Sequence, residues 1–534
     1  MNGNSINHEH ILSEAVSSLS RIETAGEYVL PDYIPDANRL LLTTACPKIE
    51  NQSIKDNRVD FEGSIRYCVL LESEENKLKS VCFSEPFSGT VDAPGISDEC
   101  YASIIPQITA VNSRLANPRK ISIKSSVCVA SKLYCEKDIS PEITGVSSMD
   151  DELALERDCK DVTSLLIVAA EETGIPVSED IELDSASPAI NEIVFSNVTI
   201  DPVDIRVRSE EAEVKSDLTF TCIYEAEGGG YSCIVKKLPV SAVVSADGLQ
   251  EGMELTATAT IGAEPVKVSV QENSYGERRI IELDLEYDLS LSCYGKKEVS
   301  VVCDMYSTAS ETSAYYTDLP IISYRRGYQT NLSVNAAAPR SDVGAEKMKT
   351  VLCGNVRVGE INASYEKDKG KLYVDGTAAI TVVGENDAPS ENEPMYSSAT
   401  FNFPFRLELD PGENPENCSF IVNASIISER FRLDSSNVFS DFDVGIKLVM
   451  LNTTNVTALS RLDIDPSSPI EHPSAPLTLC YPGKERLWDI AKRYRIPKST
   501  IMNANAMVTD DFSGKNVLII PKPKSKHSAH SRII

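Results

Sequence analysis

Along most of the chain, apolar residues alternate with polar ones at a period of two. The alternation is clearest in residues 58–72 (RVDFEGSIRYCVLLE), 120–134 (KISIKSSVCVASKLY) and 281–294 (IELDLEYDLSLSCY). Val, Ile, Thr, Ser and Tyr dominate these segments, and Gly, Pro, Asn and Asp separate them, as in strands joined by turns. Because such alternation buries one face and leaves the other in water, the sequence predicts antiparallel sheets and a mainly β fold.

The N-terminal segment, residues 1–27, has a different spacing of apolar residues. In HILSEAVSSLSRIE, apolar residues stand near a period of 3.6, at Ile11, Leu12, Val16, Leu19 and Ile22. This spacing predicts one short amphipathic helix before the first strand.

Three stretches of the chain are nearly the same: PFSGTVDAPG (86–95), PVSAVVSADG (239–248) and PFRLELDPG (404–412). Before each one lie an alternating strand, a polar hairpin turn and a second strand, and further strands follow a turn closed by Gly. The order indicates a tandem repeat of a β domain of roughly 120 to 150 residues. Each copy is large enough to bury its own core, which predicts beads rather than solenoid turns.

The expected units are three antiparallel, sandwich-like β domains at 28–145, 160–315 and 320–465. The stretch DIDPSSPIEHPSAP holds four prolines, so residues 466–476 are predicted to form an exposed linker. A separate module is expected at 477–521, followed by a basic tail at 522–534.

The charge of the chain is uneven. It has 80 Asp plus Glu against 51 Lys plus Arg, whereas residues 477–534 hold eleven Lys and Arg against four Asp and Glu. The acidic body disfavours nucleic acid as a partner, since phosphate binding needs clustered cations. It also disfavours an anionic membrane surface. The basic C-terminal end is a candidate for contact with an acidic partner.

Neither export nor membrane insertion is expected. The polar start MNGNSINHEH lacks the apolar core of a secretory signal. No apolar run approaches the ~20 residues that span a bilayer. A cytoplasmic location is therefore expected. There, the fourteen scattered cysteines should be small, reduced, buried apolar residues rather than disulfides.

Enzymatic chemistry is disfavoured by the histidines. All five lie near the termini, and none occurs from Ile11 to Glu471. A Ser-His or Cys-His pair and a His-based metal centre are thereby excluded from the body. The pair His8 and His10 could hold a metal, but the simpler interpretation is that both residues belong to an exposed N-terminal stretch. We predict no catalytic residue, no metal site and no cofactor.

The C-terminal module has the element order β-α-α-β. A strand is expected at 477–480, and the helix LWDIAKRYR places Leu487, Ile490, Ala491 and Tyr494 on one face. A second helix is expected at 498–505 and a strand at 517–520, before Pro521. This order, with LWDIAKRY, NAN and GKNVLIIP, resembles the LysM domain.

The resemblance implies binding of N-acetylglucosamine-containing glycans such as peptidoglycan, in a groove between two loops. On this chain, the loop residues are Tyr481, Gly483, Lys484, Glu485, Arg486, Leu487, Asn503, Ala504, Asn505, Ala506 and Met507.

The first loop departs from the family pattern. A Gly followed by Asp-Thr or Asp-Ser is usual there, whereas this chain has Lys484-Glu485-Arg486. Long cations favour an ionic protein partner over a sugar, although a peptidoglycan ligand stays open. Trp488 is expected either in the core or against a ligand. Lys492, Arg493 and Arg495 are either partner contacts or a solvated face.

The repeats themselves resemble the SPOCS domain, through GEYVLPDYIPDANRLL, PFSGTVDAPG, IPVSEDIELDSASPAINEIV and VSVVCDMYST. SPOCS copies followed by one LysM domain resemble clostridial spore-coat morphogenetic proteins of the SipL/SpoVID type. The resemblance implies a non-enzymatic scaffold in the mother-cell cytoplasm, at the forespore surface. Its LysM would dock to the coat-basement ATPase or another coat morphogenetic protein. The alternative is a glycan-binding cell-wall protein.

Overall fold

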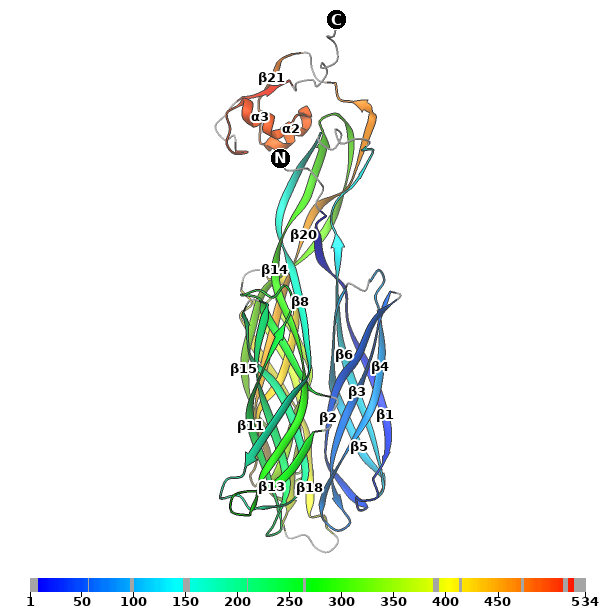
Figure 1. The fold of residues 1–534 in the computed structure, drawn as a ribbon, viewed down its shortest axis with the longest axis vertical. Coiled ribbons are helices and arrows are strands. Elements are labelled where there is room, and N and C mark those ends of the chain that lie inside the picture. The colour runs from blue at the N-terminus through cyan, green and yellow to red at the C-terminus, as the bar shows by residue number, and fades with distance from the viewer. Residues whose placement is uncertain are drawn as a thin grey trace.

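The computed structural model describes residues 8–55, 57–96, 100–146, 154–208, 210–262, 266–387, 393–412, 415–471, 475–511 and 517–522. Strands dominate, and the sheets are antiparallel except for one short parallel pairing. The predicted mainly β, antiparallel fold is confirmed. The described residues form three similar β units. A narrow extension leads from the β units to a small C-terminal head (Figure 1).

The strands of the three units follow one another in chain order. Unit 1 consists of β1 (His10–Val29), β2 (Ala37–Lys55), β3 (Arg58–Ser73), β4 (Leu78–Asp92), β5 (Tyr101–Asn117) and β6 (Lys120–Asp138). After the short β7 (Glu142–Thr144), unit 2 consists of β8 (Leu155–Glu182), β9 (Ile190–Arg208), β10 (Glu211–Ala226), β11 (Tyr231–Ser245), β12 (Glu254–Ile261), β13 (Lys267–Glu272) and β14 (Arg278–Ser307). Unit 3 consists of β15 (Ser310–Pro339), β16 (Met348–Glu366), β17 (Lys371–Asn386), β18 (Tyr396–Leu409), the 3-10 turn η1 (Pro415–Asn417), β19 (Cys418–Leu433) and β20 (Asn437–Pro469). The head consists of β21 (Leu477–Cys480), α2 (Leu487–Tyr494), α3 (Lys498–Ala504) and β22 (Leu518–Pro521).

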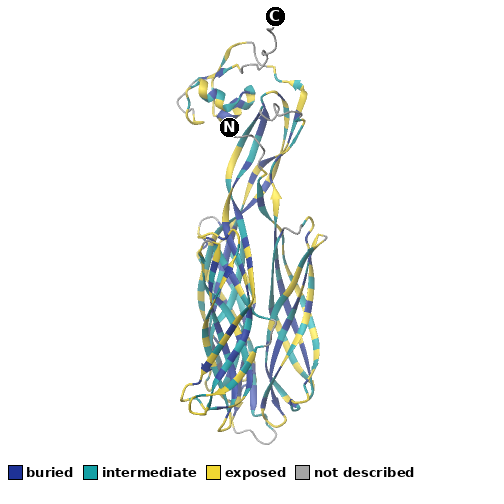
Figure 2. Cartoon of the chain, viewed as in Figure 1, coloured by how far each residue is buried: buried dark blue, intermediate teal, exposed yellow. Residues whose placement is uncertain are grey.

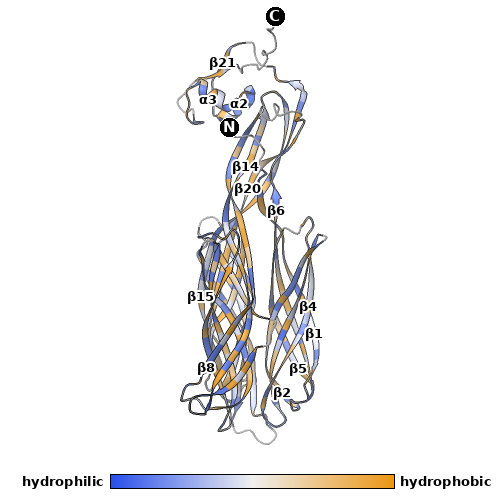
Figure 3. Cartoon of the chain, in the orientation of Figure 1, coloured by the Kyte–Doolittle hydropathy of each residue, from blue (hydrophilic) through white to orange (hydrophobic). Residues whose placement is uncertain are grey.

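Each unit has the same two sheets. In unit 1 the sheet orders are β1-β6-β5 and β2-β3-β4, and in unit 3 they are β15-β20-β19 and β16-β17-β18. Unit 2 repeats this order, with its fifth strand divided into β12 and β13. The two sheets of a unit enclose its own apolar core, because hydrophobic residues alternate along the strands (Figure 3).

The glycine that closes the turn after each Pro signature has the same backbone conformation in all three units. Gly95, Gly248 and Gly412 have φ values of 83°, 88° and 70°. Left-handed backbone of this kind favours glycine, since a Cβ is disfavoured there. The recurring Gly of the sequence repeat therefore marks the recurring turn between the fourth and fifth strands.

The predicted helix near the N-terminus is wrong. Residues His10–Val29 form β1, which pairs with β6 along its whole length. Leu19, expected on the apolar face of the helix, is 64% exposed. Pairing with the long β6 satisfies the backbone of this segment, and this tertiary contact overrides a weak helical periodicity.

Each unit has its own core, but the units also pack against one another. The fourth strand of each unit contacts the second strand of the next one, as β4–β9, β11–β16 and β18–β2, so the units close into a ring. An apolar cluster from all three units lies at the ring's centre, formed by Leu41, Leu42, Cys68, Leu70, Leu78, Val194, Phe195, Ile223, Cys353, Val383 and Tyr396. Figure 2 shows buried positions concentrated inside the body and exposed ones on its outer strands and loops.

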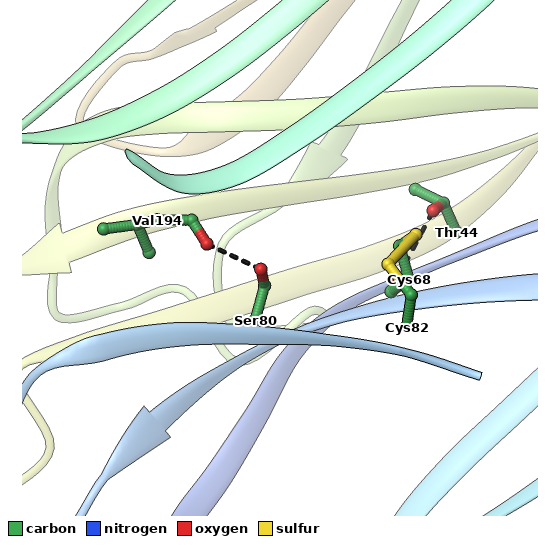
Figure 4. Close-up of a disulfide and its surroundings, with 5 residues drawn as sticks. All are labelled: Thr44, Cys68, Ser80, Cys82 and Val194. Carbon is green, nitrogen blue, oxygen red and sulfur yellow. Dashed lines mark hydrogen bonds between the residues drawn. A yellow bond between two sulfur atoms is a disulfide. The ribbon is translucent and has the colours of Figure 1, made fainter. Parts of the chain in front are cut away.

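Polar contacts also cross from unit to unit. The Ser80 hydroxyl donates to the carbonyl of Val194 at 2.6 Å (Figure 4). The backbone N–H of Met395 donates to the Glu72 carboxylate at 2.9 Å. These bonds join unit 1 to units 2 and 3 and satisfy groups that the ring withdraws from water.

Two disulfides contradict the expectation that the cysteines are all reduced. Cys68–Cys82 joins β3 to β4 (Figure 4), and Cys100–Cys135 joins the start of β5 to β6. Cys68 and Cys82 are direct register partners, so the pairing follows from strand register and not from any sequence spacing. The other ten cysteines are free thiols.

Above the ring, two antiparallel strand pairs, β8 with β14 and β15 with β20, continue beyond the units. We call this part the stalk: residues 155–166 with 295–307, and residues 310–322 with 453–469. The strand β7 joins it by parallel pairing with β20. Because β20 continues to Pro469, residues 466–469 of the expected linker are strand. Figure 1 shows the stalk leading from the three units to the head.

Candidate functional site

The head has the predicted β-α-α-β order. Its two strands pair antiparallel, and both helices pack on one side of them. The buried core includes Leu487, Trp488, Ile490, Ala491, Ile501, Leu518 and Ile520. Trp488 is 3% exposed, so its ring belongs to the core and not to an open ligand surface.

The residues predicted for ligand contact fall into two groups. Those exposed on the two loops are Tyr481, Gly483, Lys484, Glu485, Arg486, Asn503, Ala504 and Ala506. Leu487 is buried, and Met507 is partly buried against the head core. The structure thus brings most of the predicted loop residues to the surface, whereas Leu487 and Met507 serve packing.

Asn505 has a structural contact that accounts for its presence in the NAN motif. Its side-chain amide donates to the carbonyl of Ile519 at 2.7 Å and accepts from the backbone N–H of Ile519 at 2.8 Å. The amide therefore occupies the free edge of β22, in the way that a neighbouring strand would.

Arg486 lies at the start of α2 and points to the stalk. Its guanidinium lies 3.0 Å from the Asp158 carboxylate on β8 and 3.2 Å from Asp489. Asp489 also accepts from the backbone N–H of Arg486 at 3.2 Å, which caps the helix. The cation expected to bind a partner is thus paired with carboxylates of the same chain.

Asp304 on β14 is the centre of the contact between stalk and head. Its carboxylate accepts from the indole N–H of Trp488 at 2.8 Å, from Lys492 at 2.7 Å and from the Tyr316 hydroxyl at 2.8 Å. Burial alone would raise the pKa of Asp304, but these hydrogen bonds outweigh it and hold the pKa below the ordinary value. The side chain of Asp304 is only 15% exposed, so this contact is shielded from solvent.

Tyr306, two residues further along β14, enters the core of the head. Its side chain is fully buried, and its ring centroid lies 5.0 Å from that of Trp488. Its hydroxyl donates to the carbonyl of Ile496 at 2.8 Å. The stalk therefore contributes a core residue to the head.

The edge of the contact is ionic. Arg495 lies 2.7 Å from the Glu311 carboxylate and donates to the Thr312 hydroxyl at 3.0 Å. Arg493 instead pairs with Glu485 inside the head, at 2.7 Å. Of the three cations on α2 and at its end, Lys492 and Arg495 bind the stalk, so the helix face that they occupy is not simply solvated.

The sequence interpretation missed Asp158, Asp304 and Tyr306. The signal that could have found them is VSVVCDMYST (299–308), where a carboxylate interrupts an otherwise apolar strand. A register shift in the β8–β14 pairing between Val302 and Asp304 accompanies it, and bulges of this kind re-aim side chains.

Two further shielded acids lie on the strands of the units, Glu429 within unit 3 and Glu72 at the contact between units 1 and 3. The pKa of Glu429 on β19 is raised to about 7 by burial, although a hydrogen bond from the Val356 N–H opposes the shift. Burial also raises the pKa of Glu72, which is 0% exposed. Among the residues that the structure describes, neither carboxyl forms an ion pair with a cation.

No cluster of His, Cys, Asp and Glu suited to a metal ion occurs in the part of the chain that the structure describes. Within the same residues, no helix is long and apolar enough to cross a membrane.

A comparison with protein families matches part of unit 1. The family described as "SipL, SPOCS domain" matches residues 36–116, which run from just before β2 through β5 of unit 1. No curated protein and no solved structure matches the chain. The SPOCS domain in unit 1 points to a structural role in spore coat assembly.

Proposed function

We propose that this chain is a non-enzymatic scaffold of the bacterial spore coat, with a LysM-like head that docks to another coat protein at the forespore surface. The SPOCS match in unit 1 carries the proposal. The resemblance of the head to LysM proteins of the spore coat suggests the coat-basement ATPase as the partner.

The arrangement of the molecule supports this role. Three units closed into a ring form a broad acidic base, and the stalk holds the head away from that base (Figure 1). Because Tyr306 and Asp304 fix the head to the stalk, a partner bound to the head would be held at a set distance from the body. An adaptor with a fixed geometry loses little conformational entropy when it assembles.

The position of a fluorescent fusion in sporulating cells tests the proposal. The full chain should form a shell around the forespore, and a chain that ends at Ile470, without the head, should lose the shell. A diffuse signal from the full chain would contradict the proposal.

Glycan binding is tested separately with the full purified chain. Sedimentation with purified peptidoglycan should leave the protein in the supernatant. Co-sedimentation that N-acetylglucosamine oligomers compete away would favour the cell-wall alternative.

A further inference from the structure

The two-stranded sheet of the head has an exposed apolar face. Leu477 and Leu479 on β21 are 48% and 51% exposed, and Ile519 on β22 is 39% exposed. Tyr481, directly after β21, continues the alternation and is 73% exposed. Most large hydrophobic residues of the chain are at least partly covered. The concentration of exposed large hydrophobic residues on the small head therefore indicates a contact surface.

Strand register places these side chains together. Leu479 pairs with Ile519, and Leu477 pairs with Pro521. Directly opposed residues of an antiparallel pair point to the same face. The alternate residues, Cys480 and Leu518 among them, face the helices and are buried. We call Leu477, Leu479, Ile519 and Pro521 the ribbon patch.

The stalk does not cover the ribbon patch. Among the described residues, the hydrogen bonds between stalk and head involve α2, the residues that flank α2 and Lys498. The helices lie between these contacts and the two strands, and Figure 1 shows β21 on the side of the head away from the stalk. The ribbon patch is thus at the tip of the molecule.

Two lysines without an ion pair among the described residues follow the two strands of the ribbon patch. Lys522 directly follows β22, beside the Leu477 end, and Lys484 lies in the loop between β21 and α2, four residues after Cys480 at the opposite end. Neither has an ion pair among the residues that the structure describes. The other described cations of the head are paired with carboxylates, and they are Arg486, Lys492, Arg493, Arg495 and Lys498.

We propose that the ribbon patch is a docking surface for an apolar segment of another coat polypeptide that carries Asp or Glu at both ends. The inference rests on the proposed function and names the face of the head that carries it out. The apolar side chains would be covered by the middle of the segment, and Lys484 and Lys522 would pair with its carboxylates.

Charge argues against the other occupants. In a symmetric contact between two copies of this chain, four lysines would crowd around one small apolar surface and repel each other. A glycan is disfavoured because aliphatic side chains offer no hydrogen bonds to sugar hydroxyls, and burying such groups unpaired costs free energy.

Site-specific photo-crosslinking in sporulating cells tests the proposal. The full chain carries benzoylphenylalanine in place of Leu479, of Asn503 on the glycan-type loop, or of Val508, which is 94% exposed and lies outside the ribbon patch. We expect strong adducts from position 479, on a peptide of another coat protein with apolar residues between Asp or Glu residues.

Other outcomes distinguish a failure of the ribbon patch from a failure of the proposed docking function. Adducts from position 503 but not 479 would overturn the ribbon patch and leave the proposed docking function intact. Adducts of this chain with itself at 479 would also overturn it. No protein adduct from any of the three positions would contradict the docking function itself.

The lysines are tested in the same experiment. In the chain that carries the crosslinker at 479, the pair Lys484→Glu and Lys522→Glu should lower the adduct yield about tenfold, because two attractions become repulsions. The matched pair Lys484→Arg and Lys522→Arg keeps the charge and should retain the yield. Equal yields from both pairs would overturn the part assigned to the lysines.

Discussion

The hydroxyl of Tyr306 donates to the main-chain carbonyl of Ile496 across 2.8 Å, inside the core of a head that begins 171 residues later, at Leu477. The stalk and the head therefore share one core. The stability of the head should depend on the stalk, although its sequence resembles that of a module that folds by itself.

Truncation of Tyr306 tests this dependence. Tyr306→Ala should destabilise the head by about 3–5 kcal/mol, since it leaves a cavity next to Trp488. Tyr306→Phe, which loses only the hydrogen bond, should cost about 1 kcal/mol. Hydrogen exchange of amides in α2 and α3 measures both effects. Tyr275→Ala, at a site 87% exposed, is the control, and equal exchange in all variants would contradict the shared core.

Asp304 should make the attachment of the head sensitive to acid. The pKa of Asp304 is held below its ordinary value of 3.8 in the folded protein. The stabilisation that ionised Asp304 gives to the contact between stalk and head is therefore complete above pH 3.8. This stabilisation is lost as the pH falls through the lower pKa of the folded state. Asp304→Asn should weaken the contact between stalk and head by about 1–3 kcal/mol at neutral pH. It should also abolish the loss of stability that protonation of Asp304 causes at low pH. Tryptophan fluorescence of Trp488, the only Trp, follows the transition, and an unchanged acid transition would contradict the assignment.

Glu429 should have the opposite effect on the pH dependence of stability, because it should destabilise the folded chain as the pH rises. Burial raises its pKa from 4.5 to about 7, so the unfolded chain ionises first as the pH rises. The folded state then loses stability from about pH 4.5 to 7, and the loss is constant above that range. Glu429→Gln should stabilise the chain by about 1–3 kcal/mol at pH 8 and change little at pH 4. Denaturant unfolding at the two pH values measures the difference. A Gln variant that gains no stability at pH 8 would show that this carboxyl is not buried as described.

The Cys68–Cys82 bond should stabilise unit 1. It closes a loop of 14 residues, for which the loss of chain entropy in the unfolded state gives about 3 kcal/mol. Cys68→Ser with Cys82→Ser should lower the free energy of unfolding by this amount without reductant. With reductant, this variant and the native chain should have the same free energy of unfolding. Cys46→Ser changes a free, exposed thiol and is the control.

The sequence predicted the parts of the fold that depend on local patterns. Alternation identified the strands, the recurring Pro and Gly identified the repeat, and the LWDIAKRY segment located α2 within one residue. A helix was wrongly predicted for the β1 segment because its pairing with β6 joins residues from 91 (Val29 and Lys120) to 128 (His10 and Asp138) positions apart, which no local period records.

The ring of units was missed for a related reason. The third strand of unit 1 contains YCVLLE (67–72) next to its last residue, and every residue of this segment is buried. One face of that strand packs in unit 1 and the other in the central cluster. A continuous apolar run of this kind indicates burial on both faces, and it was the available signal for contact between units.

The candidate site was only partly predictable. Loop positions such as Tyr481 and Asn503 followed from the motif and lie at the surface. The pairing of Arg486 with Asp158 could not be predicted, because both residues are charged and far apart in sequence, and only the fold brings them within 3.0 Å.

The contacts between the fourth strand of one unit and the second strand of the next return from unit 3 to unit 1. An open array can gain or lose a module at its end and keep every remaining contact. This protein cannot: a fourth copy or a missing one would leave two complementary edges without neighbours. Functional relatives of this chain should therefore all have three units, because a duplicated or deleted unit would break the ring. A solenoid, in contrast, tolerates a change in the number of its repeats.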